Sequence, residues 1–149
     1  GLAPVIEALL HHGARPLLVV PPGPAATLGG VLVGYDGSVP AMRAMQFFAL
    51  LGLAEGLPVR VLSVAATQAE AQRLAGEGAA YLRAHGLAAE PLPVVGTHPL
   101  EAMLAEAVAM PARMVVMGAY ENSALRTLFT GSVTQKLLAA LPCPIFVAH

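Results

Sequence analysis

The chain has 149 residues, of which 56% are hydrophobic and only 11% are charged, and its net charge is -1. This length and composition predict one folded domain with a large apolar core and exclude a disordered chain. The near-neutral charge gives no electrostatic basis for binding nucleic acid or an anionic membrane surface. Proline, glycine or charged residues interrupt every apolar run before it reaches the length of a membrane span.

The cysteine content and the first residues of the chain indicate in which cellular compartment the protein is found. Cys143 is the only cysteine, so no internal disulfide can form, which fits a reducing environment. Its place between two prolines, ahead of the last apolar run, favours a buried structural thiol. Residues 1–22 contain Glu7 and end in Pro21-Pro22, which is unlike a signal peptide. We therefore expect a soluble, cytoplasmic protein with no membrane partner.

The first residues resemble the last ones. Residues 1–20 are typical of a helix followed by a short strand, Leu17–Val20, and residues 21–30 form a proline- and glycine-rich linker. Aligning Pro16 with Pro144 matches Val5, Leu9, Leu10 and Val19 with Val133, Leu137, Leu138 and Val147. We interpret residues 1–20 as the end of a preceding copy of the same domain, although any helix-proline-strand pair aligns in a similar way.

From residue 31 to residue 149 the sequence alternates between apolar runs and amphipathic segments. The expected strands are Val31–Tyr35, Val59–Val64, Leu92–Val95, Met114–Met117 and Ile145–Ala148. The expected helices run from Ser38 to about Glu55, from Thr67 to His85, from Pro99 to Pro111, and from Ser132 to Leu141. This order predicts an α/β fold: a doubly wound, open, mostly parallel sheet with helices on both faces. Two prolines in the third strand place it at an edge of the sheet, because proline cannot donate to a ladder.

Two strand ends carry the distinctive polar residues. The first strand ends at Asp36, the only aspartate, and the fourth ends at Met117-Gly118, which opens a loop closed by Gly131-Ser132. Ser132 fits the cap of the last helix, whose first N–H groups are a natural seat for phosphate. If the two strands are neighbours, Asp36 and the loop border one cleft at the carboxyl ends of the strands. Asp36 is equally consistent with a plain Asx turn.

These residues resemble the universal stress protein family. The matching segments are Val31 to Ser38, Met117-Gly118, Gly131-Ser132 and Pro142 to Val147, within about residues 30–149. The resemblance implies a five-stranded sheet in the order 3-2-1-4-5, counted from the strand at Val31. It also implies that ATP, with or without Mg²⁺, occupies the cleft of a stress-response sensor or regulator.

The resemblance places the nucleotide-binding residues at matching positions of this chain. They are Gly34, Asp36, Val64, Met117, Gly118, Arg126, Gly131, Ser132, Val133 and Thr134. Asp36 and Gly34 are expected near ribose and adenine, with Val64 beside the base, and the residues from Arg126 onward near the phosphates. Glu121 stands where nucleotide-binding members have a second loop glycine. It favours an alternative, a structural or interaction module of the same fold that binds no nucleotide.

Familiar catalytic motifs are missing from the sequence. The only lysine, Lys136, is not part of a Gly-Lys-Ser/Thr motif, which excludes a P-loop NTPase. Ser38 has no obvious histidine partner, which disfavours a serine hydrolase. We therefore expect no catalytic residues and at most slow ATP turnover.

The last strand bears on the partners of the chain. In the universal stress protein family it pairs across a two-fold interface. The resemblance thus implies either a homodimer through Ile145–Ala148 or an intramolecular pseudo-dimer in which Leu17–Val20 pairs with that strand.

Overall fold

The fold was analysed in a computed structural model that describes residues 15–23, 29–118 and 143–148. The strands of this part are β1 (Leu17–Val19), β2 (Val31–Gly34), β3 (Pro58–Ala65), β4 (Ala88–Val95), β5 (Met114–Gly118) and β6 (Ile145–Ala148). The helices are α2 (Val39–Leu50), α3 (Gln68–Ala84) and α4 (Pro99–Ala109). The helix expected after Ser132 and the one expected before Pro16 lie outside the described residues.

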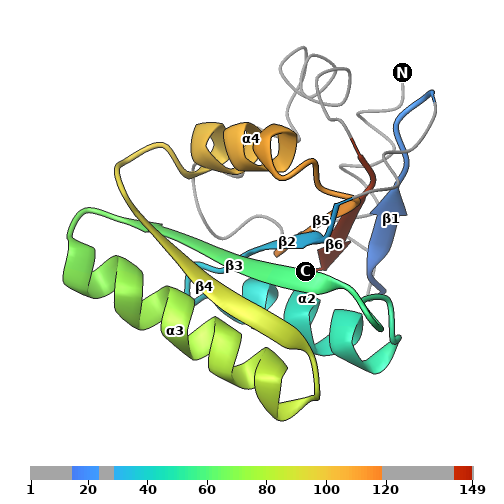
Figure 1. The fold of residues 1–149 in the computed structure, drawn as a ribbon, viewed down its shortest axis with the longest axis horizontal. Helices are drawn as coiled ribbons and strands as arrows, with labels where there is room; N and C mark the ends of the chain where they lie inside the picture. Colours follow the sequence, from blue (N-terminus) through green and yellow to red (C-terminus); the bar gives the residue numbers. More distant parts are fainter. Residues whose placement is uncertain (1–14, 24–28, 119–142, 149) are drawn as a thin grey trace.

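The strands form one mixed sheet in the order β1-β6-β5-β2-β3-β4 (Figure 1). Strands β2 to β6 are parallel, and they lie in the order expected for the five strands from Val31 onward. The expectation of a five-stranded sheet is wrong in one respect, because β1 adds a sixth strand antiparallel to β6. In this pairing Leu17 lies opposite Val147 and Val19 lies opposite Ile145.

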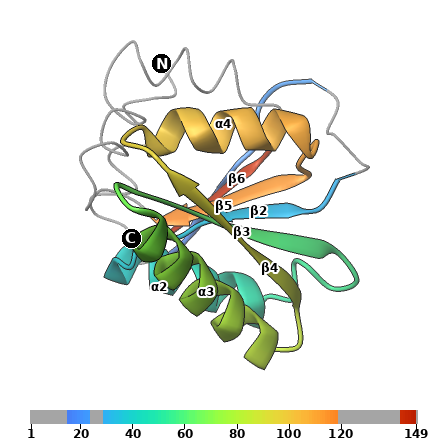
Figure 2. The same cartoon turned by 60° about the vertical axis from the view of Figure 1, so that its left-hand side comes forward.

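The described helices cover both faces of the sheet, as predicted. α4 lies on one face, and α2 and α3 lie on the other (Figure 2). Side chains alternate along each strand, so Leu32 packs in the cluster with α4, while Val31 and Val33 pack in the cluster with α2 and α3. Both clusters are apolar, which explains why the strands read as continuous hydrophobic runs.

The helices begin where their capping residues predict. Ser38 precedes α2, and its hydroxyl accepts a hydrogen bond from the N–H of Ala41 at 3.2 Å. Thr67 precedes α3, and its hydroxyl accepts from the N–H of Glu70 at 3.3 Å. Each cap satisfies a backbone donor that has no partner within the helix.

Two boundaries differ from the sequence-based expectation by several residues, and the other boundaries that differ do so by one or two. α2 ends at Leu50 rather than near Glu55, because Gly52 and Gly56 adopt positive φ angles of 67° and 74° in the turn that follows. β4 begins at Ala88 rather than Leu92, since it pairs with β3 along its whole length. β4 is an edge strand, as its prolines predict.

Candidate functional site

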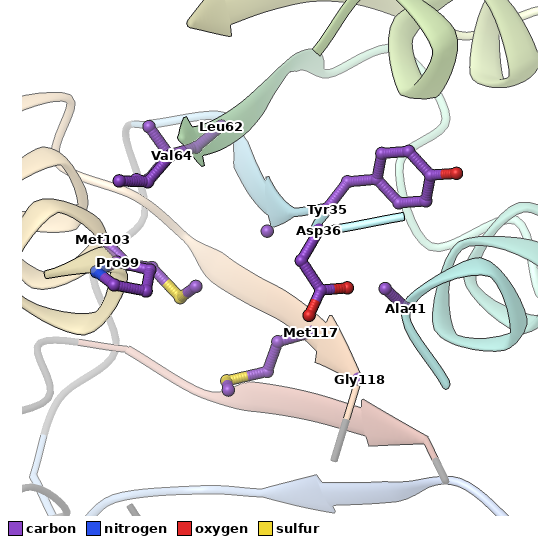
Figure 3. Close-up of a pocket in the computed structure, with 10 residues that line it drawn as sticks. Tyr35, Asp36, Ala41, Leu62, Val64, Pro99, Met103, Met117 and Gly118 are labelled. Atoms are coloured by element: carbon purple, nitrogen blue, oxygen red, sulfur yellow. The ribbon is translucent and has the colours of Figure 1, made fainter. Parts of the chain in front are cut away.

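A pocket opens at the carboxyl ends of β2, β3 and β5, beside the first turns of α2 and α4 (Figure 3). β2 is the point where the strand order reverses, because β3 lies on one side of it and β5 on the other. Open α/β sheets bind their ligands at such a point. The residues that line the pocket are Gly34, Tyr35, Asp36, Ala41, Leu62, Val64, Pro99, Met103, Met117 and Gly118.

Asp36 brings a carboxylate to this pocket. One carboxylate oxygen, Oδ1, accepts a hydrogen bond from the N–H of Ser38 at 2.9 Å, which closes an Asx turn. The turn passes through Gly37, whose φ of 82° favours glycine. Figure 3 shows the carboxylate directed into the pocket. The local sequence therefore fixes the orientation of an anionic hydrogen-bond acceptor.

Tyr35 contributes its backbone to the pocket, while its ring points away from it (Figure 3). Its N–H donates to the carbonyl of Leu62 at 3.0 Å, and its carbonyl accepts from the buried hydroxyl of Ser63 at 2.6 Å. These bonds tie the end of β2 to β3. Burial raises the pKa of the Tyr35 phenol, and the nearby carboxylates of Glu77 and Asp36 raise it further, so the hydroxyl stays neutral near pH 7.

Two glycines allow neighbouring elements to approach closely. A Cβ atom at Gly118 would lie 2.5 Å from the carbonyl carbon of Pro40 and even closer to the backbone N of Ala41. A Cβ atom at Gly34 would lie 2.5 Å from Cε of Met103. The first glycine therefore admits the start of α2 and the second admits a side chain from α4.

The remaining lining is apolar and leaves little free space. Met103 and Met117 are 6% and 1% exposed, and the cavity volume is about 40 Å³. Among the described residues that line it, Asp36 is the only one with a charged side chain. An apolar pocket with one oriented polar group suits the apolar part of a small molecule that also carries hydroxyl groups.

The structure brings together five of the residues expected at the site. Those that line the pocket are Gly34, Asp36, Val64, Met117 and Gly118. The others lie outside the described residues, and these are Arg126, Gly131, Ser132, Val133 and Thr134 together with Glu121. A role of either group in holding nucleotide stays a prediction.

Sequence reasoning missed the other half of the lining, which consists of Tyr35, Ala41, Leu62, Pro99 and Met103. The signal for α4 was present: Pro99 begins the helix after β4, and Met103 lies four residues later on the same side. The packing of α4 across the ends of β2 and β3 could not be predicted from the sequence.

Other groups in the described part of the chain lie outside the pocket or form no further site. Cys143 is fully buried, as expected, and burial raises the pKa of its thiol to about 11. No group of three or more histidine, cysteine or acidic residues suited to a metal ion occurs within residues 15–23, 29–118 and 143–148. Within these same ranges no helix has the length and apolar character needed to cross a membrane.

Comparison with known proteins gives a family match over most of the chain. Residues 29–149 match the model of the universal stress protein family. A universal stress protein of Synechocystis sp. is 30% identical over 142 residues, covering 94% of this chain and 49% of that protein. A universal stress protein of Thermus aquaticus, from the region 3′ of a sulfhydrylase gene, is 32% identical over 135 residues, covering 80% of this chain and 97% of that protein.

Solved structures share the fold. A universal stress protein from Archaeoglobus fulgidus matches 97% of this chain and 53% of its own length, with a TM-score of 0.73 and 23% identity. Another from the same organism, in complex with dAMP, matches 83% of this chain and its full length, with a TM-score of 0.61 and 20% identity. The chain thus spans about half the length of the Synechocystis relative and of the first of these structures.

Proposed function

The chain belongs to the universal stress protein family, and we propose that it binds an adenine nucleotide, ATP, as a stress-response sensor or regulator. The observation that carries this proposal is the pocket at the strand-order reversal, into which Asp36 directs its carboxylate. The dAMP complex of the Archaeoglobus protein supports an adenine nucleotide as the ligand class.

The lining residues fit an adenosine group in their chemistry. The apolar side chains of Leu62, Val64 and Met117 suit a flat base, and the carboxylate of Asp36 suits the hydroxyl groups of a ribose. We assign the phosphates, with or without Mg²⁺, to Arg126 and to Gly131–Thr134, where the sequence predicts a loop and the start of a helix. A helix start supplies N–H donors and the positive end of a dipole to such a group.

ATP turnover by this chain is at most slow in this proposal. The described residues that line the pocket include a single carboxylate and neither a histidine nor a lysine. They therefore contain no pair of nucleophile and base that would activate a water molecule. Steady-state ATP hydrolysis at several turnovers per second by the pure protein would contradict this part.

A second candidate function is an interaction module of the same fold that binds no nucleotide. The small free volume of the pocket, about 40 Å³, favours it, as does Glu121 at a position where nucleotide-binding members have glycine. In that case the partner-binding surfaces, rather than the pocket, carry the function.

We further propose that residues 1–20 are the end of a preceding copy of the domain, residues 21–30 are a linker, and residues 31–149 are the nucleotide-binding unit. The antiparallel pairing of β1 with β6 supports an intramolecular pseudo-dimer, because β1 occupies the edge through which two chains would otherwise pair. The reducing environment indicated by a single cysteine supports a cytoplasmic location.

Calorimetric titration with ATP and Mg²⁺ tests the main proposal. We expect micromolar binding that is lost in a Gly131→Asp/Ser132→Ala variant, since that variant removes the phosphate seat. Absence of heat at millimolar ATP in the unaltered protein and in every variant described below would favour the interaction module instead.

Asp36 allows a sharper test of the same site. Asp36→Asn keeps an oxygen that can close the Asx turn but removes the negative charge, whereas Asp36→Ala removes both. If the carboxylate holds the ribose, Asp36→Asn should raise the Kd for ATP about tenfold through loss of charge-assisted hydrogen bonds. Its stability to urea should stay close to that of the unaltered protein, and an unchanged Kd would remove the ribose assignment.

A further inference from the structure

The pocket is too small for the ligand that its lining fits. Its volume is about 40 Å³, whereas a protein cavity that holds benzene has a volume of about 150 Å³. A purine base is larger than benzene. These side chains can therefore enclose a base only if one of them moves.

Met103 is the lining side chain best suited to move. It is unbranched and ends in a polarizable thioether, so it changes shape at lower cost than the branched Leu62 or Val64. Figure 3 shows its sulfur and methyl group directed into the pocket. The methyl group lies over Gly34, at the place that a side chain at residue 34 would occupy.

Met117 also carries a thioether, but it is less suited to move than Met103. It belongs to β5 in the middle of the sheet and is 1% exposed, so its movement would disturb the core under the pocket. Met103, at 6% exposed, belongs to the same buried cluster as Met117, but it is carried by α4, which covers the sheet from outside. The side chain that can leave the pocket without opening the sheet is therefore Met103.

We propose that Met103 is a displaceable plug of the base subsite, so that it sets both the affinity and the size limit for the purine of the nucleotide. This inference rests on the proposed function. The thioether fills the space over Gly34 when no nucleotide is bound and turns aside when a base enters. Gly34 is part of the same device, because the methyl group of Met103 occupies the space that a Cβ atom at residue 34 would take.

The cost of moving the plug should appear in the apparent affinity. If the open orientation of Met103 is populated at about one tenth, the measured Kd is about tenfold higher than that of an open pocket. Met103→Ala removes the plug and should lower the Kd for ATP about tenfold, equivalent to about 1.4 kcal/mol. It should also let the pocket accept N6-benzyl-ATP, whose base carries an extra ring.

The experiment titrates ATP and N6-benzyl-ATP into the full chain and three variants by calorimetry. Met103→Ala opens the pocket, and Met110→Ala is the matched control, because Met110 follows α4 and packs against the same apolar cluster but does not line the pocket. Gly34→Ala places a methyl group 2.5 Å from Cε of Met103 and should push the thioether further into the pocket, which raises the Kd. Urea denaturation of each variant checks that it is folded.

The double variant Gly34→Ala/Met103→Ala distinguishes two reasons for weaker binding by Gly34→Ala: displacement of Met103 into the pocket, or a general effect on the fold. With the thioether gone, the methyl group at residue 34 should no longer weaken binding, so the two changes should be strongly non-additive. In parallel, the methyl resonance of Met103 in protein labelled with ¹³C-methyl methionine should shift on addition of ATP.

Each outcome decides the inference. Tighter binding in Met103→Ala with an unchanged Met110→Ala supports the plug, and so does binding that appears only when Met103 is replaced. If the unaltered chain binds ATP, but Met103→Ala leaves the Kd unchanged or raises it, the plug is wrong and the proposed function stands, whether or not the Met103 methyl resonance shifts. If neither the unaltered chain nor the Met103→Ala variant binds any nucleotide, the proposed function fails and the plug fails with it.

Discussion

Gly118 lies where the end of β5 meets the first turn of α2. A methyl group at this position would overlap the backbone of Pro40 and Ala41, which cannot turn aside as a side chain can. We expect Gly118→Ala to lower the free energy of unfolding by about 1–3 kcal/mol, the usual cost of overpacking. Urea denaturation measures this loss.

Gly76 provides the matched control for that substitution. It lies within α3, and a Cβ atom there would have no neighbour within 4 Å. Gly76→Ala should raise the free energy of unfolding by about 0.5–1 kcal/mol, because alanine is the better helix residue. Equal effects of the two substitutions would show that close packing at Gly118 does not limit the fold.

The thiol of Cys143 gives a prediction for pH dependence. Burial raises its pKa from 9.0 to about 11, which disfavours the thiolate in the folded chain. The thiolate is the reactive form, so at pH 8 iodoacetamide should label the folded chain at least about 100-fold more slowly than the urea-unfolded chain. Labelling of the folded chain should accelerate as the pH approaches 11 rather than 9. Mass spectrometry follows both reactions, and equal rates at pH 8 would contradict a buried thiol.

At the scale of helices and strands, local signals predicted the fold well where they were sufficient. Both ends of α3 follow from Thr67 and from His85-Gly86, because caps act through bonds within a few residues. The expected end of α2, near Glu55, was wrong. Leu51 and Leu53 extend the apolar pattern of the helix beyond Leu50, although their side chains are 58% and 37% exposed. Apolar periodicity cannot distinguish a buried helix face from an exposed apolar turn.

The start of β4 and the place of Met103 in the pocket were not predicted either. The reason is that both depend on contacts between elements far apart in the sequence. Ala88 and Ala89 have low strand propensity and join β4 because β3 supplies a pairing partner. Asp36 and Gly118 were expected at the site because they follow strands directly, and strand ends meet at one edge of the sheet. Met103 was not, because its place over Gly34 depends on how α4 crosses the sheet.

At the scale of the whole molecule, β1 lies outside residues 29–149, which match the family model. It pairs with β6 and extends the sheet beyond the five parallel strands. Leu18 of β1 and Val20, which follows the strand, are 52% and 60% exposed, so the described residues leave apolar side chains uncovered at this edge of the sheet. Here β1 occupies the outer edge of β6, so two chains cannot pair through β6 unless β1 leaves.

This occupancy predicts an oligomeric state that depends on β1. A chain lacking residues 1–20 exposes the edge of β6, and an exposed strand edge is a template for pairing with another chain. We expect that truncated chain to form dimers in light-scattering measurements after size exclusion. The control lacks only residues 1–14 and keeps β1, so it should show the same oligomeric state as the chain of 149 residues. If both truncated chains are monomeric, or if both dimerise, β1 does not act as the built-in substitute for a second copy.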